Sequence, residues 1–121
     1  MNQKAWKSKI KKNTVQIGTY RKEFEPIIDT LAAVMETRDE ALEAYEQQGR
    51  HPVIEHTNQG GNTNSVKNPL LVLLSDLNAQ ALTYWRELGL TPAGLKKLNE
   101  QAVKIEAKKS ALESALDSLG A

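Results

Sequence analysis

The sequence predicts an all-α protein in which two long helices form a hairpin and further helical segments flank it. Apolar residues recur at intervals of three and four over most of the chain, which is the spacing of one face of an α-helix. Asn68-Pro69 and Thr91-Pro92 each place a capping residue before a proline, a usual start of a helix. Gly18, Gly49 and Gly89 stand where periodic segments end, as C-terminal glycines do.

The composition bounds the core and excludes several classes of site. The 121 residues suffice for one domain, and with aromatic residues at 5% its core rests on Leu, Ile, Val and Ala. The chain has no cysteine, which excludes disulfides and thiolate metal sites. No apolar run approaches the length of a membrane span, and the N-terminus lacks the apolar region of a signal peptide. We therefore expect a cytosolic protein that is not secreted.

The charge is distributed unevenly along the chain. The net charge is +1, yet residues 1–22 contain seven bases and no acid, and the rest of the chain holds nine bases and fifteen acids. Fold stability does not require such a basic segment, so the segment indicates a function. We predict that this function is DNA binding. The bases of the segment are Lys4, Lys7, Lys9, Lys11, Lys12, Arg21 and Lys22.

Residues 4–17 are predicted to form a short amphipathic helix. At 100° per residue one side carries Trp6, Ile10, Thr14 and Ile17, and all five lysines fall on the opposite side. A solvated surface and a sequence-independent phosphate-binding face are equally compatible with these lysines. An interfacial membrane helix is the third interpretation, which the small number of apolar residues disfavours.

Two longer helices are predicted over residues 23–48 and 69–88, packed antiparallel. Only Arg38 interrupts the apolar stripe of the first, which consists of Phe24, Ile28, Leu31, Met35, Leu42 and Tyr45. The main stripe of the second consists of Leu70, Leu73, Leu74, Leu77, Ala81, Tyr84, Trp85 and Leu88. Between these helices, residues 49–68 lose the helical period, and either a β-hairpin around Gly60-Gly61 or a functional loop fits them.

Part of the second long helix is predicted to contact another subunit. Leu71, Val72 and Leu82 lie outside its main stripe, and a helix that is apolar on two sides usually has two neighbours. Trp85 is an aromatic residue on a helical stripe, and such residues lie either in the core or at an interface hot spot. We assign these four residues to an oligomer interface.

The last helix begins at Thr91-Pro92 and has a heptad pattern. Its apolar positions are Leu95, Leu98, Ala102, Ile105, Leu112, Leu116 and Leu119, with Lys109 at the missing position. This 3.5-residue period predicts a coiled-coil seam, so Ile105, Leu112 and Leu116 join the predicted oligomer interface. Residues 110–113 also fit a capping box, which would break the helix near Ser110.

The sequence carries no recognisable catalytic or cofactor motif. The Gly60-Gly61 pair lacks the lysine and hydroxyl of a phosphate-binding loop. His51 and His56 are the only histidines, and their spacing does not set them facing each other as metal ligands, so surface positions are favoured over a metal site. We therefore predict no enzyme activity, no catalytic residue, no metal and no cofactor.

Four stretches resemble the small terminase subunits of tailed phages, most of all those of cohesive-end phages and prophages of Gram-positive bacteria. They are residues 18–20 (GTY), 55–58 (EHTN), 66–69 (VKNP) and 81–97 (ALTYWRELGLTPAGLKK). The similarity covers roughly residues 6–100, and the Asn-Pro followed about twenty residues later by Gly-Leu-Thr-Pro is its most specific part. Many relatives have a Ser-Arg pair where this chain has Gly94-Leu95-Lys96, so Lys96 or Lys97 would take over any role of that arginine.

The resemblance implies a role in genome packaging in the cytoplasm of an infected bacterium. Such subunits form rings, bind double-stranded viral DNA and recruit or regulate a large subunit that carries the ATPase and nuclease. Together with the charge and heptad patterns, it divides the chain into a basic DNA-binding arm (residues 1–22), a helical oligomerisation core (23–100) and a coiled-coil-like end (101–121). Residues beyond about 105 lie outside the resemblance, and their heptads alone assign them to oligomer or large-subunit contact. Two alternatives remain, a helix-turn-helix transcription regulator and a helical scaffold that does not bind DNA.

Overall fold

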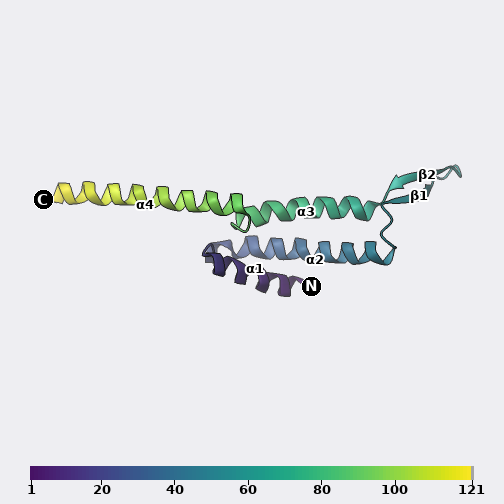
Figure 1. Ribbon diagram of the computed structural model, residues 1–121, viewed down its shortest axis with the longest axis horizontal. Coiled ribbons are helices and arrows are strands. Elements are labelled where there is room, and N and C mark those ends of the chain that lie inside the picture. Colours follow the sequence, from purple (N-terminus) through teal and green to yellow (C-terminus); the bar gives the residue numbers. More distant parts are fainter. Residues whose placement is uncertain (121) are drawn as a thin grey trace.

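Four α-helices and one β-hairpin make up residues 1–120, the part of the chain that the computed structural model describes. The elements are α1 (Gln3–Ile17), a 3-10 turn η1 (Lys22–Phe24), α2 (Glu25–Gln47), β1 (Val53–Thr57), β2 (Thr63–Lys67), α3 (Pro69–Glu87) and α4 (Pro92–Gly120). Figure 1 shows α2 and α3 side by side, with α1 against the other side of α2. The hairpin projects from one end of this body, and α4 leaves the other end nearly in line with α3. The predicted helical hairpin is therefore confirmed.

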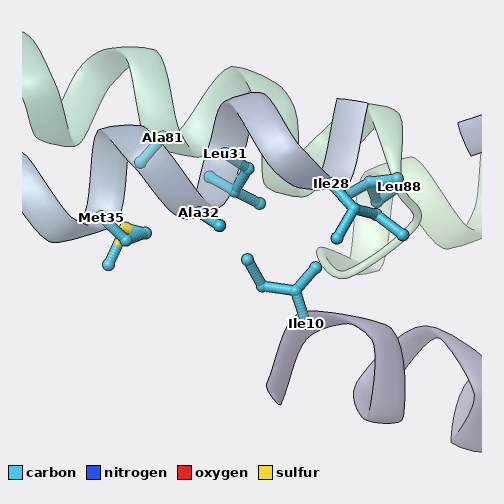
Figure 2. Close-up of a cluster of buried hydrophobic side chains, with 7 residues drawn as sticks. All are labelled: Ile10, Ile28, Leu31, Ala32, Met35, Ala81 and Leu88. Atoms are coloured by element: carbon cyan, nitrogen blue, oxygen red, sulfur yellow. The ribbon is translucent and has the colours of Figure 1, made fainter. Parts of the chain in front are cut away.

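The main core lies where α1, α2 and α3 meet. Figure 2 shows its buried side chains, to which α1 contributes Ile10, α2 Ile28, Leu31, Ala32 and Met35, and α3 Ala81 and Leu88. A second cluster towards the hairpin contains Ala41, Tyr45, Leu74 and Leu77. Arg38, the one interruption of the apolar stripe on α2, lies between the two clusters in the sequence.

The helix ends follow the predicted capping signals. Asn68 accepts a hydrogen bond from the Leu70 N–H (3.0 Å), and the Thr91 hydroxyl accepts one from the Gly94 N–H (3.0 Å). At the end of α3, Gly89 has φ +72°, and the Leu90 N–H donates to the Trp85 carbonyl (2.8 Å), as in a Schellman motif. α4 continues without a break to Gly120, so the capping box at Ser110 does not end the helix.

Residues 49–68 contain the hairpin rather than a structureless loop. β1 and β2 are antiparallel, with Val53 opposite Lys67 and Thr57 opposite Thr63. Asn68, which is 1% exposed, ties the hairpin to the helices, because its side-chain amide donates to the His51 carbonyl (2.9 Å) and to Gln48 (3.2 Å). The Asn-Pro pair therefore both starts α3 and holds the base of the hairpin.

The core face of α3 differs in one respect from the predicted stripe. Leu73 is 41% exposed, whereas Leu71 is half-buried against the second cluster. Within residues 1–120, α2 is the only helix that covers this half of α3, so the buried arc is narrow and Leu73 falls outside it. The expectation that Leu73 belongs to the core is wrong.

We predict that Gly94→Ala destabilises the fold. An added Cβ would lie 2.2 Å from the Arg86 carbonyl oxygen, which is backbone of α3 and has little room to move. Overpacking of this kind costs roughly 1–3 kcal/mol, whereas alanine is otherwise the better helix residue. The free energy of unfolding, measured with urea, should fall by this amount. Gly120→Ala, in the same helix with nothing within 4 Å of the added atom, should leave it nearly unchanged; equal stabilities would contradict the tight α3–α4 junction.

Candidate nucleic-acid interface

The basic helix α1 is packed against α2 and is not a free arm. Ile10 and Thr14 are fully buried, and the ion pairs of residues 1, 7 and 11 follow α2 in reverse order, so α1 runs antiparallel to α2. The Asn2 side chain caps the helix by accepting from the Ala5 N–H (2.9 Å), and Gly18 ends it with φ +78°. The amphipathic helix predicted from Lys4 to Ile17 is confirmed.

Two of the lysines of α1 are paired with carboxylates of α2. Lys7 Nζ lies 2.9 Å from Asp29 and 3.7 Å from Glu25, and Lys11 Nζ lies 3.1 Å from Glu25. Lys11 also lies 5.2 Å from the centre of the Tyr20 ring. The wheel argument that put all five lysines opposite the apolar side is therefore wrong for Lys7 and Lys11, which border the buried face.

The start of α1 is held by two further acids of α2. The N-terminal ammonium of Met1 lies 3.0 Å from Asp39, and the Trp6 indole N–H donates to the same carboxylate (2.7 Å). The Gln3 N–H, in the first turn, donates to Glu36. Carboxylates near the exposed N–H groups of a helix N-terminus are favourable because of the helix dipole.

These contacts shift the pKa values of the groups involved. The hydrogen bond from the Tyr20 hydroxyl, followed by that from Lys11, lowers the pKa of Glu25. Burial acts to raise the pKa of Asp39, but the hydrogen bonds from Trp6 and the N-terminal ammonium, with the nearby positive charges, bring it below its ordinary value. The pKa values of Lys7 and Lys11 are raised, chiefly by hydrogen bonds to Asp29 and Glu25 respectively.

Three lysines of α1 remain available on its outer side. Lys4, Lys9 and Lys12 are exposed, and they form no ion pair with any group of residues 1–120. Lys9 lies 5.1 Å from the centre of the Trp6 ring, an arrangement that leaves its ammonium charged and accessible. The outer side of α1 is therefore an uncompensated cationic strip.

A second group of cations surrounds the junction of the α1–α2 turn with α4. Arg21 lines a hollow of about 230 Å³ together with Gln101 of α4. Arg86 and Lys97 line an adjoining hollow of about 110 Å³, which also includes Gln101. Lys22 is exposed in the same turn as Arg21. Arg21 thus lines a hollow beside one that Arg86, Lys97 and the acid Glu87 line, while Lys22 lines neither.

The predicted oligomer-interface residues differ in how far the protomer itself covers them. Most of them are exposed, namely Val72 (43%), Leu82 (49%), Ile105 (65%), Leu112 (61%) and Leu116 (58%). Leu71 is half-buried against the second cluster, and Trp85 is half-buried with its ring 6.4 Å from that of Trp6. The first five therefore leave apolar surface that the protomer does not cover, while Leu71 and Trp85 are partly covered within the protomer.

The carboxylate stripe on α2 was missed in the sequence, although its spacing carries the signal. Glu25, Asp29, Glu36 and Asp39 follow one another at intervals of four, seven and three residues, which places them on one side of a helix. Acids beside the apolar stripe of one helix can pair with lysines beside the apolar side of a neighbouring helix. These ion pairs help to hold α1 against α2. They also neutralise Lys7 and Lys11, so that only part of the positive charge of α1 stays unpaired.

Residues 1–120 show neither a metal-binding cluster nor a membrane-spanning helix. These residues contain no group of three or more His, Asp or Glu side chains placed to hold a metal ion. Their helices also include none with an apolar stretch sufficient for a membrane crossing.

The fold and its surface define a small helical protein with uncovered apolar side chains on α3 and α4 and a cationic first helix. A family model described as "Phage terminase, small subunit" matches residues 3–104, from α1 into the first part of α4. The chain belongs to the phage terminase small-subunit family, as the resemblance predicted. This family has a role in phage genome packaging. Comparisons with curated proteins and with solved structures give no match.

We predict that acid weakens the attachment of α1. A carboxyl group whose pKa is lowered by folding contributes stability above its unfolded pKa, and this stability is lost as the pH falls through the folded pKa. For Glu25 and Asp39 the loss is expected to begin as the pH falls below about 5 and to continue through their lowered folded pKa values. Urea unfolding followed by tryptophan fluorescence should show it.

The variant Glu25→Gln with Asp39→Asn should be less stable than the wild type at pH 7 and should lose less stability on acidification. Glu40→Gln is the control, because Glu40 is an exposed acid of α2 without an ion pair in residues 1–120. If the double variant and the control followed the same pH profile, the carboxylate stripe would not hold α1.

Proposed function

We propose that this protein is a DNA-binding, ring-forming small terminase subunit that recruits or regulates the large terminase subunit in the cytoplasm of an infected bacterium. The observation that carries the proposal is the cationic strip of Lys4, Lys9 and Lys12 on a packed helix of a chain that belongs to this family. A rigid helix presents these charges in a defined direction, so several protomers in a ring would present them together. The catalytic step is assigned to the large subunit, and none to this chain.

Phosphate contacts without base readout fit the residues of the strip. Lysine is a flexible point charge that attracts phosphates and releases counterions regardless of sequence. One protomer offers few such contacts, but an assembly multiplies them through effective concentration. Arg21, which lines a hollow beside the base of α4, and the exposed Lys22 in the same turn would extend the interface in that direction.

The helix-turn-helix alternative does not match the arrangement of α3 and α4. In that motif the two helices cross at about 90–120°, so that the second helix lies in the major groove. α4 instead continues nearly in line with α3 (Figure 1). The Gly-Leu-Thr-Pro turn therefore serves to extend the helical body.

The proposal predicts that Lys4→Gln with Lys9→Gln and Lys12→Gln weakens binding to duplex DNA. The slope of log affinity against log salt should become shallower by about 0.9 for each phosphate that the variant no longer neutralises. Fluorescence anisotropy with a labelled duplex at several salt concentrations measures both quantities. Substitution is the sharper test, because deletion of residues 1–12 would also remove Trp6 and Ile10 from the core.

The matched control is Lys104→Gln with Lys108→Gln and Lys109→Gln, which removes the same charge from α4. This control should keep the wild-type salt slope. Equal effects of the two triple variants would show that net charge, and not the strip on α1, determines binding.

Assembly is predicted because the protomer leaves apolar side chains uncovered on α3 and α4. Light scattering at micromolar concentration should report a closed oligomer of this chain. Val72→Asp with Leu82→Asp should shift the distribution towards monomer, since each charge would have to be buried. A monodisperse monomer in the wild type would refute the assembly.

A further inference from the structure

The half of the helical body next to the hairpin carries a groove of about 760 Å³ between α2 and α3. Its floor is apolar and comes from the second cluster, with Leu42 and Tyr45 of α2 and Leu71 and Leu74 of α3. Val72, at the edge, is 43% exposed. The protomer therefore leaves an apolar channel uncovered along its two main helices.

The rim of this groove is mainly cationic. Arg38, Arg50 and Lys67 line it, and Asp76 is the single acid among the lining residues. Arg50 is paired with Glu46 (2.7 Å) and Arg38 with Asp39 (3.1 Å), while Lys67 has no ion pair in residues 1–120.

Arg38, which lines the groove, has a hydrogen-bond donor without an acceptor. Its Nε is buried and has no hydrogen-bond partner among residues 1–120. A buried donor without an acceptor costs free energy, and a carboxylate is the best partner for a guanidinium because it can accept two bonds at once. The groove thus fits an occupant that combines apolar side chains with carboxylates.

The end of α4 has this combination. Leu112, Leu116 and Leu119 are 61%, 58% and 85% exposed and follow one another at intervals of four and three, as the anchors of a helix that binds in a groove do. Glu113 borders this stripe, and Asp117 lies one turn further along, farther round the same side of the helix. Residues 110–120 contain no base, so self-pairing of these ends would bring carboxylates together without compensation.

The two surfaces cannot meet within one protomer. The groove lies next to the hairpin, whereas α4 leaves the opposite end of α3 and runs away from the body (Figure 1). As a continuous helix of 29 residues it extends about 44 Å in that direction. Any occupant with the chemistry of α4 must therefore come from a second copy.

We infer that the terminal part of α4, residues 110–120, docks into the α2–α3 groove of a neighbouring copy. The inference rests on the proposed assembly and specifies which surfaces form it. The leucines cover the apolar floor, and Glu113 and Asp117 face the cations of the rim. Because each copy offers one helix end and one groove, the contact is head-to-tail, and its repetition closes into a ring when the rotation per subunit permits.

The test uses cysteine cross-linking, since the chain has no cysteine of its own. The double variant Ser75→Cys with Ala115→Cys places one thiol at the groove and one beside the leucine stripe. A short bis-maleimide is expected to produce a ladder of covalent dimers and larger species in a denaturing gel. Ser75→Cys with Ser114→Cys is the matched control, because position 114 lies on the opposite side of α4, and it should give severalfold less.

Each single variant is also cross-linked, and the oligomer mass is measured by light scattering. Equally strong dimers from Ala115→Cys alone would overturn the inference in favour of an α4–α4 seam. An oligomer in which the double variant gives no more product than the control would overturn the inference and leave the proposed assembly standing. A monomer would overturn both.

The charge component is tested by adding Glu113→Lys and Asp117→Lys to the double variant. The added lysines would face Arg38 and Lys67, so the yield of the ladder should fall severalfold. An unchanged yield would overturn the pairing of the acidic flank with this groove.

Discussion

The junction between α3 and α4 is the constraint on which the rest of the molecule depends. Leu88 is fully buried at the end of α3, and the Thr19 hydroxyl donates a hydrogen bond to its carbonyl (2.8 Å), which joins the α1–α2 turn to α3. Gly89 then takes a left-handed conformation that ends α3, and Gly94 lets α4 approach the backbone of Arg86. α4 leaves the core at once and continues nearly in line with α3 (Figure 1), so its apolar stripe is not covered by the protomer. Arg21, in the α1–α2 turn, comes to lie beside its base.

The docking of α1 divides its positive charge into two parts with different roles. Lys7 and Lys11 lie beside the buried side of the helix and are matched by the carboxylate stripe of α2, so they contribute to the position of α1. Lys4, Lys9 and Lys12 are exposed, and no ion pair in residues 1–120 compensates their charge. A free arm would offer all of its lysines to a polyanion but would lose conformational entropy on binding. A docked helix offers fewer lysines, but their positions are already fixed before binding. It therefore favours an interface with few phosphate contacts in a defined arrangement.

Most of the fold could be predicted from the sequence because the residues that start and end its helices act locally. Asn68-Pro69, Thr91-Pro92, Gly18 and Gly89 act through backbone geometry within a few residues, and the structure confirms all four. The candidate site was harder, because a charge pattern on one helix does not say which charges another helix will neutralise. Lys7 and Lys11 could be separated from the other lysines only once the carboxylate stripe of α2 was seen beside them. Leu73 was misplaced for a similar reason, since periodicity gives an apolar face but not the width of the neighbour that covers it.

The outer half of α4 is a helix whose stability depends on what surrounds it. Beyond Leu98, every residue of α4 up to Gly120 is exposed, so this part of the helix has little besides its backbone hydrogen bonds to hold it. Most helical stability in proteins comes from packing of the apolar face, and residues 99–120 have no such packing within the protomer. Burial of Leu112, Leu116 and Leu119 against another chain would supply that packing, at about 25 cal/mol for each Å² of apolar surface removed from water. If protomers associate through these leucines as proposed, the order of α4 and the association would both follow from the same burial.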